Sequence, residues 1–411
     1  MHFKLRAALM AGALAITSQP AVAEPITLDQ AVRRAIAASP AIEAQEAGVR
    51  SARAGRSQAD VRPNPVLSLE AENFAGTGAY DVYRQAETTV TYAQTIERGG
   101  KRDARVAYAQ RDIGVAEASA RLGRLDLAQA VQRAFIDLQI AGEVVWLAGR
   151  RLETERMMQT EALRRVRGYK DPLFVETRAE ARVAQAQLAL AEAETLRGAA
   201  RARLVSYWGG NAEDVEVPRG IEQPDDHLHQ LAEADSALSS AAVERAQAAV
   251  MVEQTRGVQD YTVSGGVRHL RQTGDVALVA GISIPLGRFD RNRGGIERAQ
   301  AERQQIELQA EAARLDRLRQ LASLRTEADA ARARADGIMQ DVYPKAVRTL
   351  QQVREGYNRG GFRFSDVQDA ADVITEVQSQ WVEAMTRYRD ILSQIDRLTG
   401  RFDVVAGEEA Q

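Results

Sequence analysis

The chain has 411 residues, with 54 Lys and Arg against 57 Asp and Glu, a formal charge of −3 and no cysteine. The near-neutral charge argues against a dedicated nucleic-acid binder, which needs a basic surface. The lack of cysteine excludes disulfides, thiolate metal sites and cysteine nucleophiles, and a mean hydropathy of −0.35 excludes a bundle of membrane-spanning helices.

The N-terminus has the pattern of a secretory signal peptide. A short basic start precedes an apolar stretch at 7–16, and a cleavage motif of the A-x-A kind ends at Ala23. We therefore predict a signal peptide over 1–23 and a mature chain that begins at Glu24 in a bacterial envelope. No later segment is apolar over about 18 residues, so any further membrane span must consist of β-strands.

The mature chain follows one plan twice, and the first copy covers 24–210. It begins with a predicted helix, after which apolar and polar residues alternate in two runs that predict a β-hairpin. A glycine pair precedes a long stretch without proline, which predicts a long helix, and a turn leads to one more helix. The predicted ranges are 28–59 for the first helix, about 66–96 for the hairpin, about 101–167 for the long helix and about 172–208 for the last helix.

An irregular segment at 211–227 joins this copy to a second one over 228–400, which is followed by a tail at 401–411. The second copy repeats the plan, with a helix at about 228–257, a hairpin at about 261–284, a long helix at about 296–357 and a helix at about 365–398. The glycine pairs at 99–100 and 294–295 lie 195 residues apart, and the Gly-Tyr pairs at 168–169 and 356–357 lie 188 residues apart. These two spacings indicate an internal two-fold repeat.

Apolar residues in the long helices recur in alternating steps of three and four, which is typical of coiled coils. The helix at about 365–398 has the clearest seam. The seam predicted for the second long helix consists of Leu321, Leu324, Ala328, Ala331, Ala335, Ile338 and Val342. On the helices alone, a plain coiled-coil rod is the simplest prediction.

The predicted strands change that interpretation, because each has the length that crosses a bilayer when tilted. Four strands leave two open edges, and lipid does not tolerate open edges, since their backbone groups lack partners. We therefore predict that three chains contribute hairpins to one closed twelve-stranded barrel. The fold class is then mainly α with β, with long coiled-coil helices and two membrane hairpins per chain. A small soluble β-domain carried on a coiled coil is the alternative.

Three segments carry a resemblance to a known family. They are QTIERGGKRDAR at 94–105, DPLFVETRAEARVAQAQLALAEAE at 171–194 and SIPLGRFDRNRGGI at 283–296. The chain resembles the outer membrane factor (TolC-like) family over its whole mature length, and these segments resemble the heavy-metal efflux (CzcC-like) subgroup. One departure is the pair Gly287-Arg288, where the subgroup often has more apolar residues.

The resemblance implies a homotrimer with a β-barrel in the outer membrane of a Gram-negative bacterium and an α-helical tunnel across the periplasm. It also implies a periplasmic adaptor (membrane fusion) protein and an inner-membrane RND pump as partners. The expected function is a passive exit duct for heavy-metal cations. A channel for drug efflux or type I secretion is the alternative, and a soluble coiled-coil scaffold is a weaker one.

Two acidic residues are candidates for a periplasmic gate. Asp366 and Asp369 lie three residues apart at the start of the last predicted helix. A helix dipole favours acids there, which is a purely structural explanation. The resemblance instead places SDVQDA where the family's channels close their entrance with acidic rings, and such rings concentrate cations.

Two further sets of residues are candidate contact sites. The turns between the helices are expected to dock the adaptor, through Gly168, Tyr169, Asp171, Gly360 and Gly361. Basic residues begin both long helices, although the helix dipole disfavours them there. We expect them to meet lipid phosphates, as a girdle of Lys101, Arg102, Arg105, Arg291 and Arg293.

Catalytic motifs are absent from the sequence, and we predict no enzyme activity, no cofactor and no resident metal. His227 and His229 form an H-x-H pair on a proline-bounded segment without further ligands nearby. His269 is expected in an outer loop, and Tyr80, Tyr83, Tyr92 and Phe289 are candidates for aromatic girdles.

Overall fold

The structure, a computed structural model, describes residues 25–218 and 231–403. The predicted signal peptide, residues 219–227 of the joining segment with His227, His229, and most of the C-terminal tail lie outside the described residues. The helices are α1 (Leu28–Ala38), α2 (Pro40–Ala59), α3 (Lys101–Arg167), α4 (Phe174–Val205), α5 (Glu233–Arg256), α6 (Arg293–Gly337), α7 (Tyr343–Asn358) and α8 (Phe364–Thr399). The strands are β1 (Val66–Glu72), β2 (Glu87–Ile96), β3 (Tyr261–Leu270) and β4 (Asp275–Ser283).

Two units make up the described chain, one with residues 25–31 and 134–218 and the other with 32–133 and 231–403. In the first unit, α4 packs on the second half of α3. Their contact is a thin apolar seam in which small side chains let the helices approach closely, formed by Leu152, Val183, Ala186 and Leu190. The predicted long helix of the first copy is confirmed over its full length.

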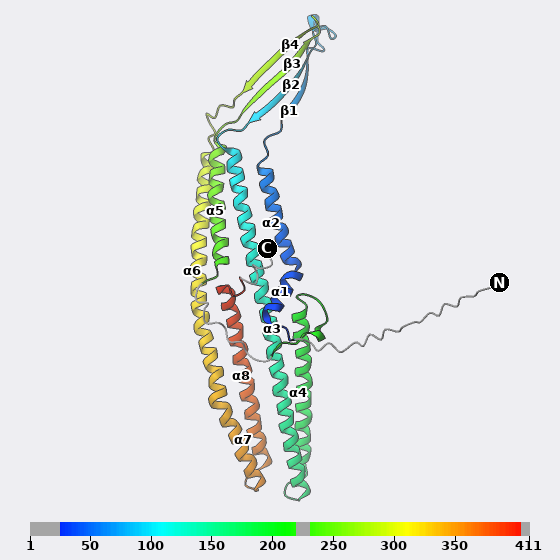
Figure 1. Ribbon diagram of the computed structural model, residues 1–411, viewed down its shortest axis with the longest axis vertical. Coiled ribbons are helices and arrows are strands. Elements are labelled where there is room, and N and C mark those ends of the chain that lie inside the picture. The colour runs from blue at the N-terminus through cyan, green and yellow to red at the C-terminus, as the bar shows by residue number, and fades with distance from the viewer. Residues whose placement is uncertain (1–24, 219–230, 404–411) are drawn as a thin grey trace, which may run out of the picture. The chain divides into compact units, whose positions relative to one another are not determined.

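In the second unit the strands form one antiparallel sheet in the order β1-β2-β3-β4, at the end of helices α2, α5 and α6 (Figure 1). The register places one row of apolar residues straight across it, namely Leu69, Val90, Val267 and Leu278. Leu69 is 73% exposed and Leu278 is 87% exposed. The alternation seen in the sequence is therefore real, but its apolar face is uncovered within one chain.

The opposite face of the sheet carries the charged residues of the strands, together with a few apolar ones such as Val279. Arg268 of β3 reaches Glu87 of β2 at 3.0 Å and Glu72 of β1 at 3.3 Å, and its Nε donates to Thr89 at 3.0 Å. β1 and β4 are the two outer strands of the sheet. Each hairpin is thus joined to the other by the β2–β3 pairing, while one edge of each remains without a strand neighbour in the described chain.

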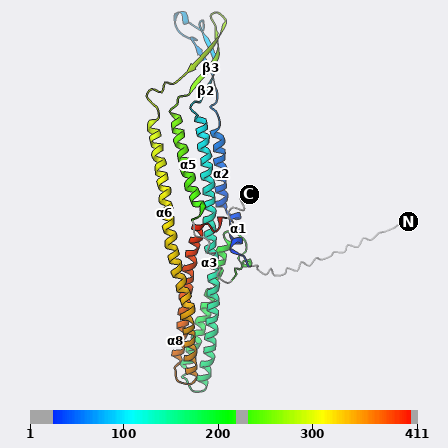
Figure 2. The same cartoon turned by 60° about the vertical axis from the view of Figure 1, so that its left-hand side comes forward.

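The coiled-coil seam predicted for the second copy is confirmed along most of α6, which α8 follows (Figure 2). Leu324, Ala328 and Ala331 of α6 pack with Tyr388 and Ile391 of α8. Alternating steps of three and four keep these side chains on one stripe of each helix, so the stripe is buried while the remaining faces are not.

The helix predicted over 28–59 is wrong as a single element. Ser39 is extended (φ −84°, ψ 114°), and α2 begins at Pro40. Proline restricts the preceding residue to extended conformations and suits the first turn of a helix, so the chain ends α1 and starts α2 at this point.

The second predicted long helix is also interrupted. Five residues, Ile338–Val342, form a π turn between α6 and α7, and Pro344 lies in the first turn of α7. Proline has no backbone N–H to give to the residue four positions earlier, which disfavours a regular helix here. Val342, expected in the buried seam, is 45% exposed.

His269 does not lie in a loop. It belongs to β3, where it pairs with Thr88 of β2 and Val276 of β4. The strand is longer than the apolar alternation indicated, because pairing with β2 continues through His269 to Leu270, which pairs with Glu87.

Candidate functional site

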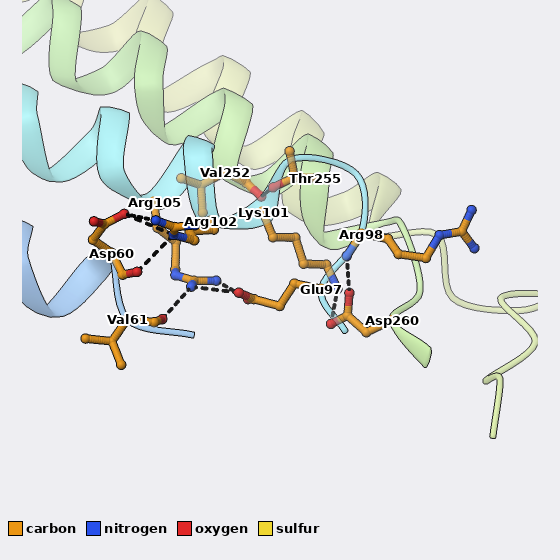
Figure 3. A network of polar contacts seen from close by, with 10 residues as sticks. All are labelled: Asp60, Val61, Glu97, Arg98, Lys101, Arg102, Arg105, Val252, Thr255 and Asp260. Atoms are coloured by element: carbon orange, nitrogen blue, oxygen red, sulfur yellow. Dashed lines mark hydrogen bonds and ion pairs between the residues drawn. The ribbon is translucent and has the colours of Figure 1, made fainter. Parts of the chain in front are cut away.

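A cluster of opposite charges lies where strands and helices of the second unit meet (Figure 3). We call it the junction cluster, and it consists of Asp60, Glu97, Lys101, Arg102, Arg105 and Asp260. Its members come from the ends of α2 and β2, the first turns of α3 and the residue before β3. The three cations are the first-copy half of the predicted lipid-phosphate girdle.

Each cation of the junction cluster is paired within the chain. Lys101 Nζ lies 2.7 Å from Asp260 Oδ2, and Arg102 Nη2 lies 2.7 Å from Asp60 Oδ1. Arg105 makes a two-pronged contact with Glu97 and also reaches the Val61 carbonyl at 3.4 Å. These carboxylates offset the unfavourable position of three cations at a helix N-terminus, and they tie α2, β2 and β3 to α3.

The ion pairs of the junction cluster shift the pKa values of two of its residues, Asp260 and Arg105. Burial alone would raise the pKa of Asp260, but hydrogen bonds from Lys101 and from the Arg98 backbone N–H (3.0 Å) hold that pKa below its usual range. The hydrogen bond from Arg105 to Glu97 raises the pKa of the guanidinium. Asp260 and Arg105 are therefore both charged throughout the physiological pH range. The junction cluster is thus a network of ion pairs.

Replacing Asp260 by Asn should destabilise the protein at neutral pH by about 1 kcal/mol, because Lys101 loses its charged partner. The pKa of Asp260 is lowered in the folded state, so its contribution is present above the unfolded pKa and is lost as the pH falls through the folded pKa. Thermal unfolding measured from pH 7 downwards should show the gap between wild type and Asp260→Asn closing at acidic pH. A gap that does not change with pH would contradict this role of the ion pair.

Both glycines before α3 have a positive φ, and at Gly99 there is also no space for a side chain. Gly99 has φ +70°, and a Cβ there would lie 2.7 Å from Val258 Cγ2. In the second copy the corresponding turn uses Asn292 (φ 55°), whose amide donates to Glu253 Oε2 at 2.7 Å. Both strand-to-helix turns therefore contain a residue with a positive φ, which is a glycine in the first copy and an asparagine in the second.

The second-copy half of the predicted girdle has a different environment. Arg291 and Arg293 are exposed. The guanidinium of Arg288 lies 5.7 Å from the ring centre of Phe289, which is 94% exposed, and Leu286 is 87% exposed. This segment presents apolar and cationic groups together, whereas the first-copy cations face carboxylates of their own chain.

The turn between α3 and α4 is held by an ion pair and presents an exposed tyrosine at its tip. Arg165 holds Asp171 through two hydrogen bonds of 2.9 and 3.1 Å, and Gly168 N–H donates to the Arg164 carbonyl at 3.2 Å. Tyr169 has φ +54° and is 98% exposed. The turn therefore presents an aromatic side chain on a fixed loop.

The turn between α7 and α8 depends on close packing of glycine. A Cβ on Gly356 would meet the Phe362 ring at 2.1 Å, Gly360 has φ +84°, and Gly361 N–H donates to the Gly356 carbonyl at 2.8 Å. Phe362 is 48% exposed. This turn thus also combines a constrained backbone with an exposed ring.

The two candidate gate residues have different surroundings. A carboxylate oxygen of Asp366 accepts a hydrogen bond from the Arg363 backbone N–H at 2.8 Å and caps α8. Asp369 is exposed one turn further along. The helix-start explanation therefore applies to Asp366, whereas the carboxylate of Asp369 is exposed.

Within the described parts of the chain, His, Asp and Glu side chains form no group of three that could hold a metal ion. Among residues 25–218 and 231–403, no helix combines the length and the apolar character needed to cross a membrane. Sequence reasoning missed Asp60, Glu97 and Asp260. Only Glu97 is near its partner along the chain; Asp260 is 159 residues from Lys101, so no local pattern reveals it.

Several outer-membrane channels of known structure share this fold of long helices and a small sheet. The outer membrane protein VceC from Vibrio cholerae has this fold, with a TM-score of 0.74 and 20% identity over 91% of this chain and 96% of that chain. The model of the outer membrane efflux protein family matches residues 31–210. The cobalt-zinc-cadmium resistance protein CzcC of Cupriavidus metallidurans is 30% identical over 92% of this chain and 91% of its own.

The nickel-cobalt-cadmium resistance protein NccC of Alcaligenes xylosoxydans xylosoxydans is 28% identical over 78% of this chain and 76% of its own. The chain belongs to the outer membrane efflux protein family. It is a transport component of the bacterial outer membrane that extends into the periplasm.

Proposed function

We propose that the chain is one subunit of a trimeric exit duct through which heavy-metal cations leave the cell. The observation that carries this proposal is the sheet, with an exposed apolar face and one open edge on each of β1 and β4. In lipid the apolar face is satisfied, and the edges are satisfied when β4 of one copy pairs with β1 of the next. Three copies then give a twelve-stranded barrel whose lumen is lined by the polar face.

The order of elements supports the proposed two-fold repeat. A helical segment, a hairpin, a long helix and a further helix follow one another in 25–210, and the same order returns in 231–400. The first segment is divided into α1 and α2 in the first copy only, and the long helix contains a π turn in the second copy only. Each copy contributes one hairpin to the sheet and one pair of long helices to the proposed periplasmic tunnel.

The cargo is inferred from relatives. Proteins named for cobalt, zinc, cadmium and nickel resistance match most of this chain, which favours divalent metals over drugs or polypeptides. A duct needs no tight ligands, because cargo that binds tightly is retained. Selection then belongs to a periplasmic adaptor and an inner-membrane RND pump, which we propose as partners.

The adaptor is proposed to dock on the two helix–helix turns. Tyr169 and Phe362 supply exposed rings, and the glycines Gly168, Gly360 and Gly361 with the Arg165–Asp171 pair fix the loops that carry them. Aromatic side chains on preorganised loops are suited to protein contacts.

The lipid-phosphate girdle is proposed chiefly for Arg291 and Arg293, which are exposed beside Leu286 and Phe289. The three first-copy cations, Lys101, Arg102 and Arg105, are paired with carboxylates. We therefore propose that their main role is to hold the strand ends against α3.

A deletion strain tests the proposed function. Growth of the native host on graded zinc, cobalt, cadmium and nickel should be inhibited at several-fold lower concentration after deletion, and a plasmid copy should restore it. The control is a panel of organic dyes and drugs, for which no change is expected. Increased drug sensitivity with unchanged metal tolerance would favour the alternative channel for organic compounds.

A further inference from the structure

The π turn absorbs one extra residue in the coiled-coil seam of the second copy. From Leu321 to Ile338 the buried residues of α6 follow steps of three and four. The next step is five residues long, and beyond it the steps of three and four return. The buried and half-buried positions on this side are Ile338, Tyr343, Ala346, Leu350, Val353 and Tyr357.

A step of five does not fit a regular α-helix. At 3.6 residues per turn it rotates the side chain by about 140°, which would place Tyr343 on the far side from Ile338. The π turn accommodates one residue more per turn, and its defining hydrogen bond is present, since the Tyr343 backbone N–H donates to the Ile338 carbonyl. The turn therefore returns Tyr343 to the seam and leaves Val342 exposed.

The extra residue is on one helix of the pair only. In α8 the seam continues past this level in steps of three and four, through Val377, Trp381 and Ala384. Ile338 and Ala335 pack with Val377 and Ala384, while Tyr343 lies against the same cluster. The pairing of the two helices thus shifts by one residue at the π turn, and two regular coiled coils meet at a local irregularity.

We propose that the π turn Ile338–Val342 is a hinge about which α7 and the first half of α8 bend relative to α6, so that the gate carrying Asp369 opens. The proposal rests on the proposed function of the chain as an exit duct. A π turn inside an α-helix is rare and is frequently found at a functional site. Met339 is 41% exposed and Val342 is 45% exposed, so bending at this turn disturbs few contacts of these two side chains.

Deleting Gln340 tests the hinge, because it turns the step of five into a step of four and leaves the seam in phase on both sides. Pro344→Ala is introduced with it, since a continuous α-helix cannot hold that proline. Relative to Pro344→Ala alone, the deletion variant should dissociate and unfold at higher temperature and should open at least tenfold less often in planar bilayers. Deleting Glu327 from the regular part of α6, as a control, should lower the unfolding temperature.

Unchanged open probability of the Gln340 deletion variant, or a lower unfolding temperature, would overturn the hinge while leaving the duct intact. A wild-type protein that forms no conducting channel would instead overturn the proposed function. The two failures are therefore distinguishable.

A second measurement does not depend on folding of a deletion variant. The chain has no cysteine, so Arg332→Cys with Thr349→Cys introduces one pair of spin labels across the π turn. Gln309→Cys with Thr326→Cys has the same spacing inside α6. In spin-diluted full-length protein in lipid, the distance distribution across the turn should be about twice as broad as the control distribution near 26 Å. Equal widths would overturn the hinge.

Discussion

Leu278→Arg should abolish most trimer formation in the outer membrane. Leu278 is 87% exposed on the apolar face of the sheet, and an arginine at the lipid face of a barrel costs about 2–4 kcal/mol per subunit. In the proposed trimer this cost occurs in every copy of the chain. The measurement is the amount of heat-modifiable trimer in outer-membrane fractions, compared at equal total expression.

The neighbouring residue provides a matched control. Val279 lies on the opposite face of β4, where it pairs with Gly266, so Val279→Arg adds the same charge toward the proposed water-filled lumen. This variant should assemble nearly as the wild type does. Equal loss of trimer for both variants would show that the two faces of the sheet do not separate lipid from water.

Asp369→Asn should reduce the preference of the channel for cations several-fold while leaving the stability of the protein unchanged. Asp369 is exposed near the start of α8, and three copies would form a ring of charge that attracts cations at a narrow aperture. Reversal potentials across planar bilayers under a salt gradient measure the preference. An unchanged reversal potential would contradict the proposed role of Asp369 in a periplasmic gate.

Asp366→Asn tests whether Asp366 stabilises the start of α8 or takes part in the proposed gate. Its carboxylate caps α8 through the Arg363 N–H, so its replacement should lower stability by about 1 kcal/mol per subunit. A change in unfolding temperature without a change in reversal potential is the expected result. The reverse result would place Asp366, rather than Asp369, in the conducting path.

Local patterns in the sequence predicted the sheet well. Alternation places Leu69 and Val90 on the same face, and the antiparallel register then aligns them with Val267 and Leu278. The prediction succeeds because the period of a strand is two, so each residue's face is fixed by its position once pairing is known.

The π turn and the junction cluster were harder to predict for physical reasons. A seam step of five and Pro344 are both visible in the sequence, but Val342 also fits a step of four, so the sequence pattern alone predicts Val342 rather than Tyr343 in the seam. The partners Asp60 and Asp260 are distant from Lys101 and Arg102 along the chain. Only the fold brings those carboxylates to the start of α3, so the sequence alone predicts a phosphate-binding surface from a run of cations at a helix start.

The open edges of β1 and β4 have a genetic consequence if three copies form one closed barrel. Each edge needs a neighbouring strand from another polypeptide, so one chain with a damaged edge prevents closure of the whole trimer. When intact and damaged alleles are expressed equally and mix at random, only about one ring in eight contains intact chains alone. Mutations on these two strands should therefore behave as dominant alleles, whereas a null allele, which supplies no chain, should be recessive.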